Sequence, residues 1–288
     1  MSRGPLDRDP GRQVCVRARP ARRVPTGDDG KAATGPQILG PFARVAGLVA
    51  SLAIACGPVP AQAIGSQTCA FPTSPSVLMA EGEPHAAGSK LLQMWEFDDA
   101  PVFASEAEPA GYEAFRRRAA AAVGDTDPLR PLRANPGRNN DLVARHAGAW
   151  VRPATCLQKL LQKAQDDRID TFASPTEFMA FVLRSPDGAR LRVYFYTANF
   201  DGIGRVGPAA EPAARDHAAG WTVLAGVHNH NFHPHDPTLN GAVGPSLPDA
   251  QFNLRFHAQT GMAEAWITNG LHTAQIPAAA FPLFEQTP

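Results

Sequence analysis

The chain has 288 residues, of which 44% are hydrophobic, and its 27 lysines and arginines balance its 27 aspartates and glutamates. This apolar content is sufficient for a packed core, so a wholly disordered chain is excluded. The balanced charge argues against a nucleic-acid-binding protein, which would carry a basic surplus. Because no run of 18 apolar residues is present, we predict no transmembrane segment in the mature chain.

Residues 1–63 have the organisation of a secretion signal with an over-extended N-terminus. A basic region ends at Arg44, an uncharged apolar run covers Val45–Ala55, and the tripeptide AQA at 61–63 matches a signal-cleavage site. The basic region is much longer than in an ordinary signal, which indicates a later start codon. We therefore predict a periplasmic or secreted protein, cleaved after Ala63. The alternative is a small buried helix without a targeting role.

The four cysteines also bear on the predicted export. Cys15 and Cys56 fall within the predicted signal. Cys56 follows Ala-Ile-Ala, so lipid attachment there is a second alternative, although the leucine expected three positions earlier is missing. Cys69 and Cys156 remain in the mature chain. An even pair in an exported protein favours one disulfide over two free thiols.

Residues 64–150 are weakly patterned, and we predict an accessory region without assigning it a fold. The segment 90–97 fits either a short strand or a helix, and 111–123 has a helix-forming composition with arginines on one side. Residues 125–141 are rich in proline, arginine and asparagine, which predicts a linker.

Clear secondary-structure signals begin at Cys156, and we take residues 151–288 as the main domain. Leucines at helical spacing predict an amphipathic helix over 156–170, and the apolar run FMAFVL predicts a strand buried on both faces at 178–183. The elements expected after it are a turn at 185–188, a strand at 191–196, a loop at 201–219, a strand at 221–227, a helix at 246–259, and two strands at 263–268 and 271–276 around an Asn269-Gly270 turn. This order predicts an α+β fold with a mixed β-sheet flanked by helices, preceded by an irregular N-terminal region.

The chemically informative residues follow the strand expected at 221–227. His228 and His230 are two positions apart, so in extended backbone both imidazoles point to one face and can approach one metal ion. The segment SLPD has the residues of a helix start, with Ser246 as N-cap and Asp249 at N3. Two histidines and one aspartate would leave one tetrahedral position open for water, which is typical of a catalytic zinc site.

Glu177 is the candidate general base. It directly precedes the predicted buried strand at 178–183, where partial desolvation would raise the pKa of a carboxyl toward neutrality. Zinc lowers the pKa of its bound water to about 7 and polarises a carbonyl group. A zinc-bound water and Glu177 as its base would together support hydrolysis. The simpler interpretations are a surface acid at Glu177, histidines without a ligand, and a helix cap without a metal.

A glutamate before a strand, then H-x-H, then S-x2-D is a pattern that resembles the JAMM metallopeptidases, also called the MPN+ or JAB-domain family. The resemblance covers about residues 155–288. It implies a sandwich fold like that of the JAMM proteins and cytidine deaminases. The resemblance also implies roles for five residues: zinc on His228, His230 and Asp249, Glu177 as general base, and Ser246 as a donor to the oxyanion.

Two features depart from the family pattern. Fifteen residues separate His230 from Ser246, where the family has seven, and Asn231 stands where the family has proline. The first departure is expected to be a loop insertion. It carries His233 and His235, which we predict to be loop residues, with a contribution to the site or a cover over it as the alternative.

The sequence therefore predicts an exported zinc-dependent hydrolase that cleaves a peptide, isopeptide or related amide bond. The expected partner is a peptide or protein substrate, either a cell-envelope peptide or a secreted protein, because the predicted compartment argues against a ubiquitin-like substrate. One alternative is a non-catalytic metal- or partner-binding module of the same fold. A third hypothesis is an exported metal-chelating protein that also uses His233 and His235.

Overall fold

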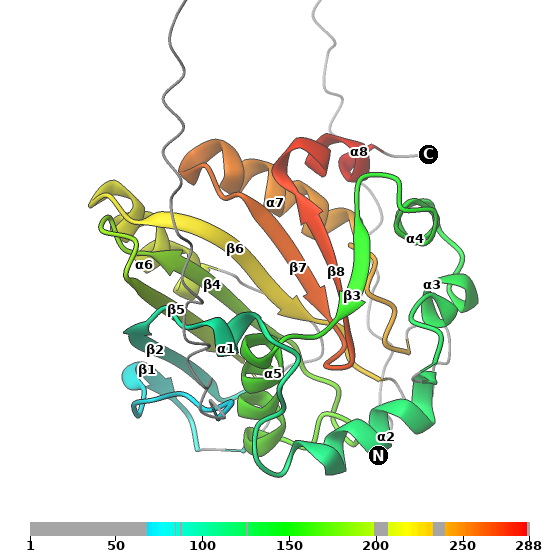
Figure 1. Ribbon diagram of the computed structural model, residues 1–288, viewed down its shortest axis with the longest axis horizontal. Coiled ribbons are helices and arrows are strands. Elements are labelled where there is room, and N and C mark those ends of the chain that lie inside the picture. Colours follow the sequence, from blue (N-terminus) through cyan, green and yellow to red (C-terminus); the bar gives the residue numbers. More distant parts are fainter. Residues whose placement is uncertain are drawn as a thin grey trace, which may run out of the picture. The chain divides into compact units, whose positions relative to one another are not determined.

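An eight-stranded mixed sheet is the central layer of the described residues in the computed structural model (Figure 1). The structure describes residues 68–286 with the exception of Pro84, Ala87, Asp125, 199–206 and 233–239. These residues belong to one compact unit, Gln62–Pro288. The predicted signal at 1–63 lies outside the described residues, as do His233 and His235.

The strand order of the sheet is β1-β2-β5-β4-β6-β7-β8-β3. The strands are β1 (Ser76–Glu81), β2 (Lys90–Asp98), β3 (Trp150–Pro153), β4 (Phe178–Arg184), β5 (Arg190–Thr197), β6 (Thr222–Asn229), β7 (Glu264–Thr268) and β8 (His272–Pro277). Within this sheet β6 and β7 pair in parallel, and the other neighbours are antiparallel.

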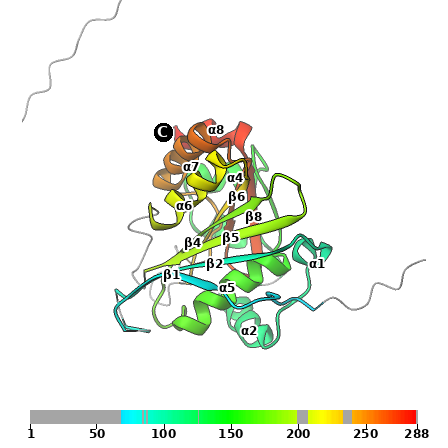
Figure 2. The same ribbon diagram turned by 90° about the vertical axis from the view of Figure 1, so that its left-hand side faces the viewer.

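Helices cover both faces of the sheet. They are α1 (Pro101–Ala104), α2 (Tyr112–Val123), α3 (Arg130–Ala134), α4 (Arg138–Ala144), α5 (Cys156–Arg168), α6 (Gly207–Ala218), α7 (Leu247–Thr260) and α8 (Phe281–Glu285), with a 3₁₀ turn at Ala278–Ala280. The core on one face includes α6, α7 and α8, and the core on the other includes α1 and α5 (Figure 2). The predicted α+β class with a mixed sheet between helices is confirmed.

Strand β4 shows why an uninterrupted apolar run forms a central strand. Alternate residues beginning with Phe178 belong to the core beneath α5, and those beginning with Met179 belong to the core beneath α6 and α7. Every side chain from Phe178 to Leu183 is at most 2% exposed. A strand with helices on both faces needs apolar residues at every position, because neither face meets water.

The helix, strands and turns predicted after Cys156 are confirmed within one to two residues, apart from the expected loop at 201–219. That loop contains α6. The helix includes Pro212, and its buried positions Ala209, Pro212 and Ala213 pack on the sheet. The loop prediction was wrong because the high alanine content and the burial of this face of α6 outweigh the helix-breaking effect of proline and glycine.

The linker expected at 125–141 was also wrong. It contains α3 and the beginning of α4, which place Leu132 and Val143 in the core at 1% and 0% exposure. Two such short helices leave no helical periodicity to recognise, and their stability comes from tertiary packing. Their position matters, because α4 lies beside the candidate site.

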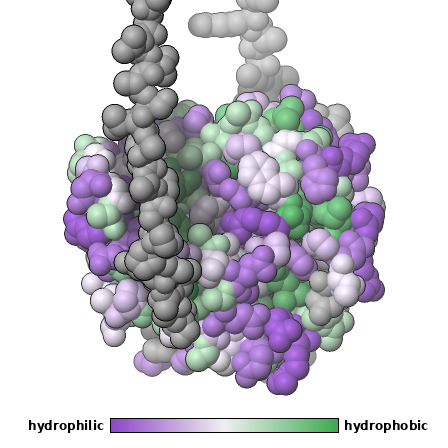
Figure 3. All heavy atoms as spheres, viewed as in Figure 1, coloured by the Kyte–Doolittle hydropathy of each residue, from purple (hydrophilic) through white to green (hydrophobic). Residues whose placement is uncertain are grey.

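The predicted accessory region contributes strands to the same sheet. The segment at 90–97 is a strand, and as β2 it pairs with β5 along its length. Helix α2 confirms the helix expected at 111–123; it carries the exposed Arg116, Arg117 and Arg118, and hydrophilic side chains gather over it in Figure 3. The segment up to residue 150 and the main domain thus share one sheet.

Helix α2 packs on the turn between β7 and β8. The Tyr112 hydroxyl donates to the carbonyl of Gly270 at 2.9 Å. Gly270 has φ +81°, and a Cβ there would lie 2.4 Å from the Phe115 ring. Glycine is therefore required both by the turn and by the close approach of α2.

Cys69 and Cys156 form the predicted disulfide, which joins the segment before β1 to the first residue of α5. Both cysteines are almost completely buried, so the bond is part of the core that includes α1 and α5. No helix in the described part of the chain is long and apolar enough to span a bilayer.

Candidate metal centre

The candidate metal centre lies where β6 ends and α7 begins. His228 is near the end of β6, His230 directly follows that strand, and Asp249 is in the first turn of α7. Glu177 precedes β4, which pairs with β6 so that its residue Met179 lies opposite His228. The antiparallel register therefore brings the glutamate to the same end of the sheet as the two histidines.

Three predicted ligands converge. The Nε2 atoms of His228 and His230 are 3.2 Å apart, and Asp249 Oδ2 lies 3.4 Å and 3.6 Å from them. Ligands at bond lengths of about 2 Å at the corners of a tetrahedron are about 3.3 Å apart. The group therefore could hold a metal ion of that bond length.

The orientation of His230 is set by a second contact. Its Nδ1 lies 2.6 Å from the carbonyl oxygen of Ala242. A carbonyl only accepts, so Nδ1 carries the proton and donates. In the neutral ring Nε2 is then unprotonated and presents its lone pair to the other two ligands, as in many metal-binding histidines.

Asp249 is held by the helix start to which it belongs. Its Oδ2 accepts from the backbone N–H of Ser246 at 2.8 Å and from the Ser246 hydroxyl at 2.7 Å. The same oxygen faces both histidines. The capping box and the ligand set thus share one atom, and the helix N-terminus favours the ionised carboxylate. In this structure Ser246 orients Asp249; its role as an oxyanion donor stays a prediction.

The electrostatics of the centre favour a positive charge. Burial acts to lower the pKa of His230, but its hydrogen bond to Asp249 and the negative charge of Glu177 outweigh burial and raise the pKa to about 9. Burial acts to raise the pKa of Asp249, but the two histidines hold it well below its ordinary range. Two carboxylates beside two imidazoles are the setting in which a cation is stabilised.

Asn229 holds the backbone on both sides of Glu177. Its Oδ1 accepts from the N–H of Phe178 at 2.7 Å, and its Nδ2 donates to the carbonyl of Thr176 at 3.4 Å. The side chain is fully buried. Residues 228 and 230 point to one face of the extended chain, so the residue between them points to the other. The residue between the two candidate metal ligands thus fixes the segment that carries the candidate base.

Asn231 extends this network. It accepts from Asn229 Nδ2 at 2.8 Å and donates to the Thr176 carbonyl, while Gln165 from α5 donates to the Thr176 hydroxyl. The sequence pattern predicted no role for Asn229 or Gln165, and it marked Asn231 only as a departure from the family pattern. The alternation of asparagine and histidine at 228–231 is the signal that could have found them, because buried amides are retained where they are hydrogen-bonded.

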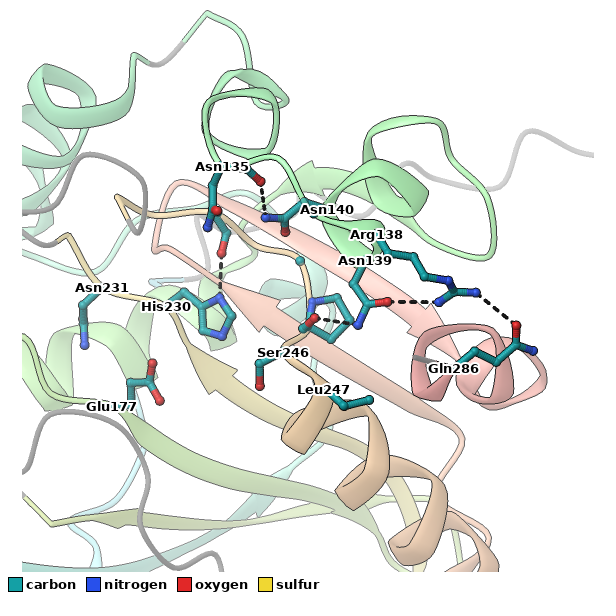
Figure 4. Close-up of a pocket in the computed structure, with 14 residues that line it drawn as sticks. Asn135, Arg138, Asn139, Asn140, Glu177, His230, Asn231, Ser246, Leu247 and Gln286 are labelled. Atoms are coloured by element: carbon teal, nitrogen blue, oxygen red, sulfur yellow. Dashed lines mark hydrogen bonds between the residues drawn. The ribbon is translucent and has the colours of Figure 1, made fainter. Parts of the chain in front are cut away.

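A pocket of about 450 Å³ adjoins the centre (Figure 4). Glu177, His230 and Ser246 line it together with residues from the segment around α4 and from the C-terminal end of α8. The Glu177 side chain is half-buried and lies at the pocket wall in Figure 4. The structure therefore brings all five predicted site residues to one place, three as a ligand group and two beside it.

No family model, curated protein or solved structure matches this chain. The resemblance to the JAMM metallopeptidases thus stays a prediction that rests on five residues and on the order of the elements around them.

Proposed function

We propose that the protein is an exported zinc-dependent hydrolase that cleaves a peptide, isopeptide or related amide bond. The observation that carries the proposal is the tetrahedral spacing of three ligand atoms beside a half-buried glutamate at the wall of a pocket. Three protein ligands leave a fourth position for water or substrate, which distinguishes a catalytic zinc site from a structural one.

Two imidazole nitrogens and one carboxylate oxygen suit zinc. When bound at such a site, zinc lowers the pKa of a coordinated water to about 7 and polarises a carbonyl group. His228, His230 and Asp249 would hold the ion. Their own partners, Ala242 for His230 and Ser246 for Asp249, fix the ligand atoms before binding.

Glu177 would take the proton from the attacking water and transfer it to the leaving nitrogen. The carbon–nitrogen bond breaks as a carbon–oxygen bond forms, and the products are a carboxylate and an amine. Asn229 supports this role because it holds the backbone on both sides of Glu177. The Ser246 hydroxyl would turn from Asp249 to donate to the developing oxyanion, while the Ser246 backbone N–H keeps its bond to Asp249.

Two features support export. The disulfide between Cys69 and Cys156 is of the kind that persists in oxidising compartments, and residues 1–63 have the organisation of a secretion signal. A cell-envelope peptide or a secreted protein is then the substrate that the protein would meet.

The test uses the purified chain, the double variant His228→Ala/His230→Ala and the variant Glu177→Gln. We expect about one zinc per chain in the wild type, none in the double variant, and zinc without turnover in Glu177→Gln. The assay is release of amines from a pool of N-acetylated peptides. Absence of zinc in the wild type after reconstitution would overturn the proposal. Zinc with no turnover of any amide would instead favour a non-catalytic metal-binding module.

A further inference from the structure

The pocket beside the metal centre has an unusual lining. Amides are the most frequent polar side chains in it, and a single arginine, Arg138, accompanies them among the lining residues. The amides are Asn135, Asn139, Asn140, Asn231 and Gln286. Figure 4 shows Glu177 and Arg138 on opposite sides of the pocket, with His230 and Ser246 between them. A molecule in the pocket would thus meet the metal centre at one end and the guanidinium at the other.

The Arg138 guanidinium is held in place by neutral groups. It donates to the carbonyl of Leu283 at 2.5 Å, to Gln286 Oε1 at 3.2 Å and to Asn139 Oδ1 at 3.3 Å. No carboxylate of the described residues pairs with it. A guanidinium has five N–H donors, so these three bonds leave donors for an anion. The positive charge at this end of the pocket is fixed in position and is not neutralised by the described chain.

The wall that carries Arg138 is fixed by its neighbours. Asn139 donates to the carbonyl of Pro245, next to the N-cap of α7, and to that of Phe284 in α8, each at 3.0 Å. Asn140 donates to the carbonyl of Asn135 at 2.7 Å. The bond to Pro245 ties α4 to the start of the helix that carries Asp249, and the bond to Phe284 ties it to α8. The distance between the cation and the metal centre is therefore set by the fold, and such preorganisation lowers the cost of binding.

Resting on the proposed function, we propose that the substrate is a short peptide whose C-terminal carboxylate binds Arg138. The residue after the cleaved bond would fill the pocket, and the enzyme would release residues from the C-terminal end. The volume of about 450 Å³ is at the small end of ligand sites and suits one or two residues rather than a long chain. Arginine is the side chain best suited to a carboxylate, because its planar donors match the two oxygens.

The test measures binding to the zinc-loaded Glu177→Gln variant of the full chain, which separates recognition from turnover. Three pools of N-acetylated tripeptides serve as probes: one with a free C-terminal carboxylate, one with a C-terminal amide, and one amidated pool with glutamate as the last residue. We expect the free acids to bind about tenfold or more tightly than the amides, as one charge-assisted contact provides. The third pool separates a terminal from a side-chain carboxylate.

The preference should disappear when Arg138→Gln is added and persist in part with Arg138→Lys. Arg145→Gln is the matched control, because it removes the same charge from an exposed residue just after α4 that does not line the pocket. Zinc content confirms that each variant is folded. Equal binding of acids and amides, binding of neither at millimolar concentration, or a preference unchanged in Arg138→Gln would overturn the inference. Tighter binding of the glutamate pool than of the free acids would do so as well.

The two proposals fail in different ways. If the wild type hydrolyses acids and amides equally well, the hydrolase stands and the carboxylate site does not. If no pool is hydrolysed but the free acids still bind through Arg138, the carboxylate site stands and the hydrolase does not.

Discussion

Two polar clusters lie at opposite ends of the same strands. At one end of β4 and β5 is the metal centre; at the other is a group that we call the Arg192 cluster, which consists of Glu96, Arg192, Tyr194 and Asp216. Arg192 donates to Glu96 at 2.9 Å and to Asp216 at 2.7 Å, and the Tyr194 hydroxyl donates to Asp216 at 2.6 Å. Both clusters are partly withdrawn from water, but their charges are arranged differently.

In the Arg192 cluster each charge meets its opposite. Burial acts to lower the pKa of Arg192, but Asp216 and Glu96 outweigh burial and raise it, and the guanidinium stacks on Trp221 at 4.0 Å from the ring centre. In the candidate metal centre the partners of Asp249 are two histidines, and no lysine or arginine of the described residues forms an ion pair with Asp249 or Glu177. In the Arg192 cluster the positive charge belongs to an arginine that keeps its proton, whereas in the candidate metal centre it belongs to a histidine proton that a metal ion can replace. This difference separates a structural cluster from a candidate binding site.

The sharpest test of the comparison removes the candidate base without disturbing the ligands. Glu177→Gln should lower kcat about 10²- to 10⁴-fold, the range that general-base catalysis contributes, and leave zinc content unchanged. Turnover and metal analysis are measured on the same samples. Glu113→Gln, an exposed acid on α2, is the control and should change neither. Wild-type turnover in Glu177→Gln would remove this residue from the mechanism.

Metal removal should affect only one of the two clusters. A ligand at one hundred times its dissociation constant stabilises a protein by about 2.7 kcal/mol, so chelation should lower the melting temperature of the wild type. The double variant His228→Ala/His230→Ala should show no such shift. Thermal unfolding with and without chelator, followed by zinc addition, is the measurement. An equal shift in both proteins would place the metal effect elsewhere in the chain.

Asn229 links the metal centre to the sheet, and its substitution should have the next largest effect. Asn229→Ala leaves the Phe178 N–H without its buried partner, which costs roughly 1–3 kcal/mol of folding stability. Because the side chain positions Glu177, we also expect kcat to fall while KM changes little. Asn229→Asp keeps the acceptor for Phe178 and should recover part of kcat.

A structural role alone would give a different result for Asn229. Stability would fall in Asn229→Ala, but kcat of the folded fraction would remain at the wild-type value. Thr268→Val is a matched control, because it removes a buried hydrogen-bonding group from the neighbouring strand β7. Thr268 is fully buried, and its hydroxyl donates to the carbonyl of His272, not to the segment that carries Glu177. It should lower stability without the loss of kcat.

The sequence predicts features that depend on local motifs and does not predict features that depend on contacts between distant residues. The candidate ligands His228, His230 and Asp249 lie in two short motifs whose spacing determines a strand end and a helix start, so the local pattern was sufficient to predict that these side chains converge. Strand β4 was equally clear because its apolar run has no interruption. The Asn229 contacts join residues 51 positions apart, and no local pattern encodes such a pairing.

Arg138 shows a second limit of sequence patterns. Its segment has the composition of a linker, because asparagine and proline favour turns. The packing of Leu132 and Val143 and the hydrogen bonds of Asn139 to distant backbone make this segment part of the pocket wall. Helix α6, which supplies Asp216 to the Arg192 cluster, escaped prediction for a related reason: its stability depends on a buried face, and its composition resembles that of a loop.

The prediction with the smallest expected effect concerns the Tyr194 hydroxyl in the Arg192 cluster. Burial and the hydrogen bond to Asp216 raise the pKa of Tyr194 to about 12, so the folded protein binds the phenolic proton more tightly than the unfolded chain, whose tyrosines titrate near 10. This contribution is complete below pH 10 and is lost as pH rises from 10 to 12. Tyr194→Phe should cost about 1 kcal/mol at neutral pH, and its unfolding free energy should fall less steeply over that interval. Denaturant unfolding at several pH values measures both, and equal slopes in the two proteins would show that Tyr194 does not favour its protonated form in the folded state.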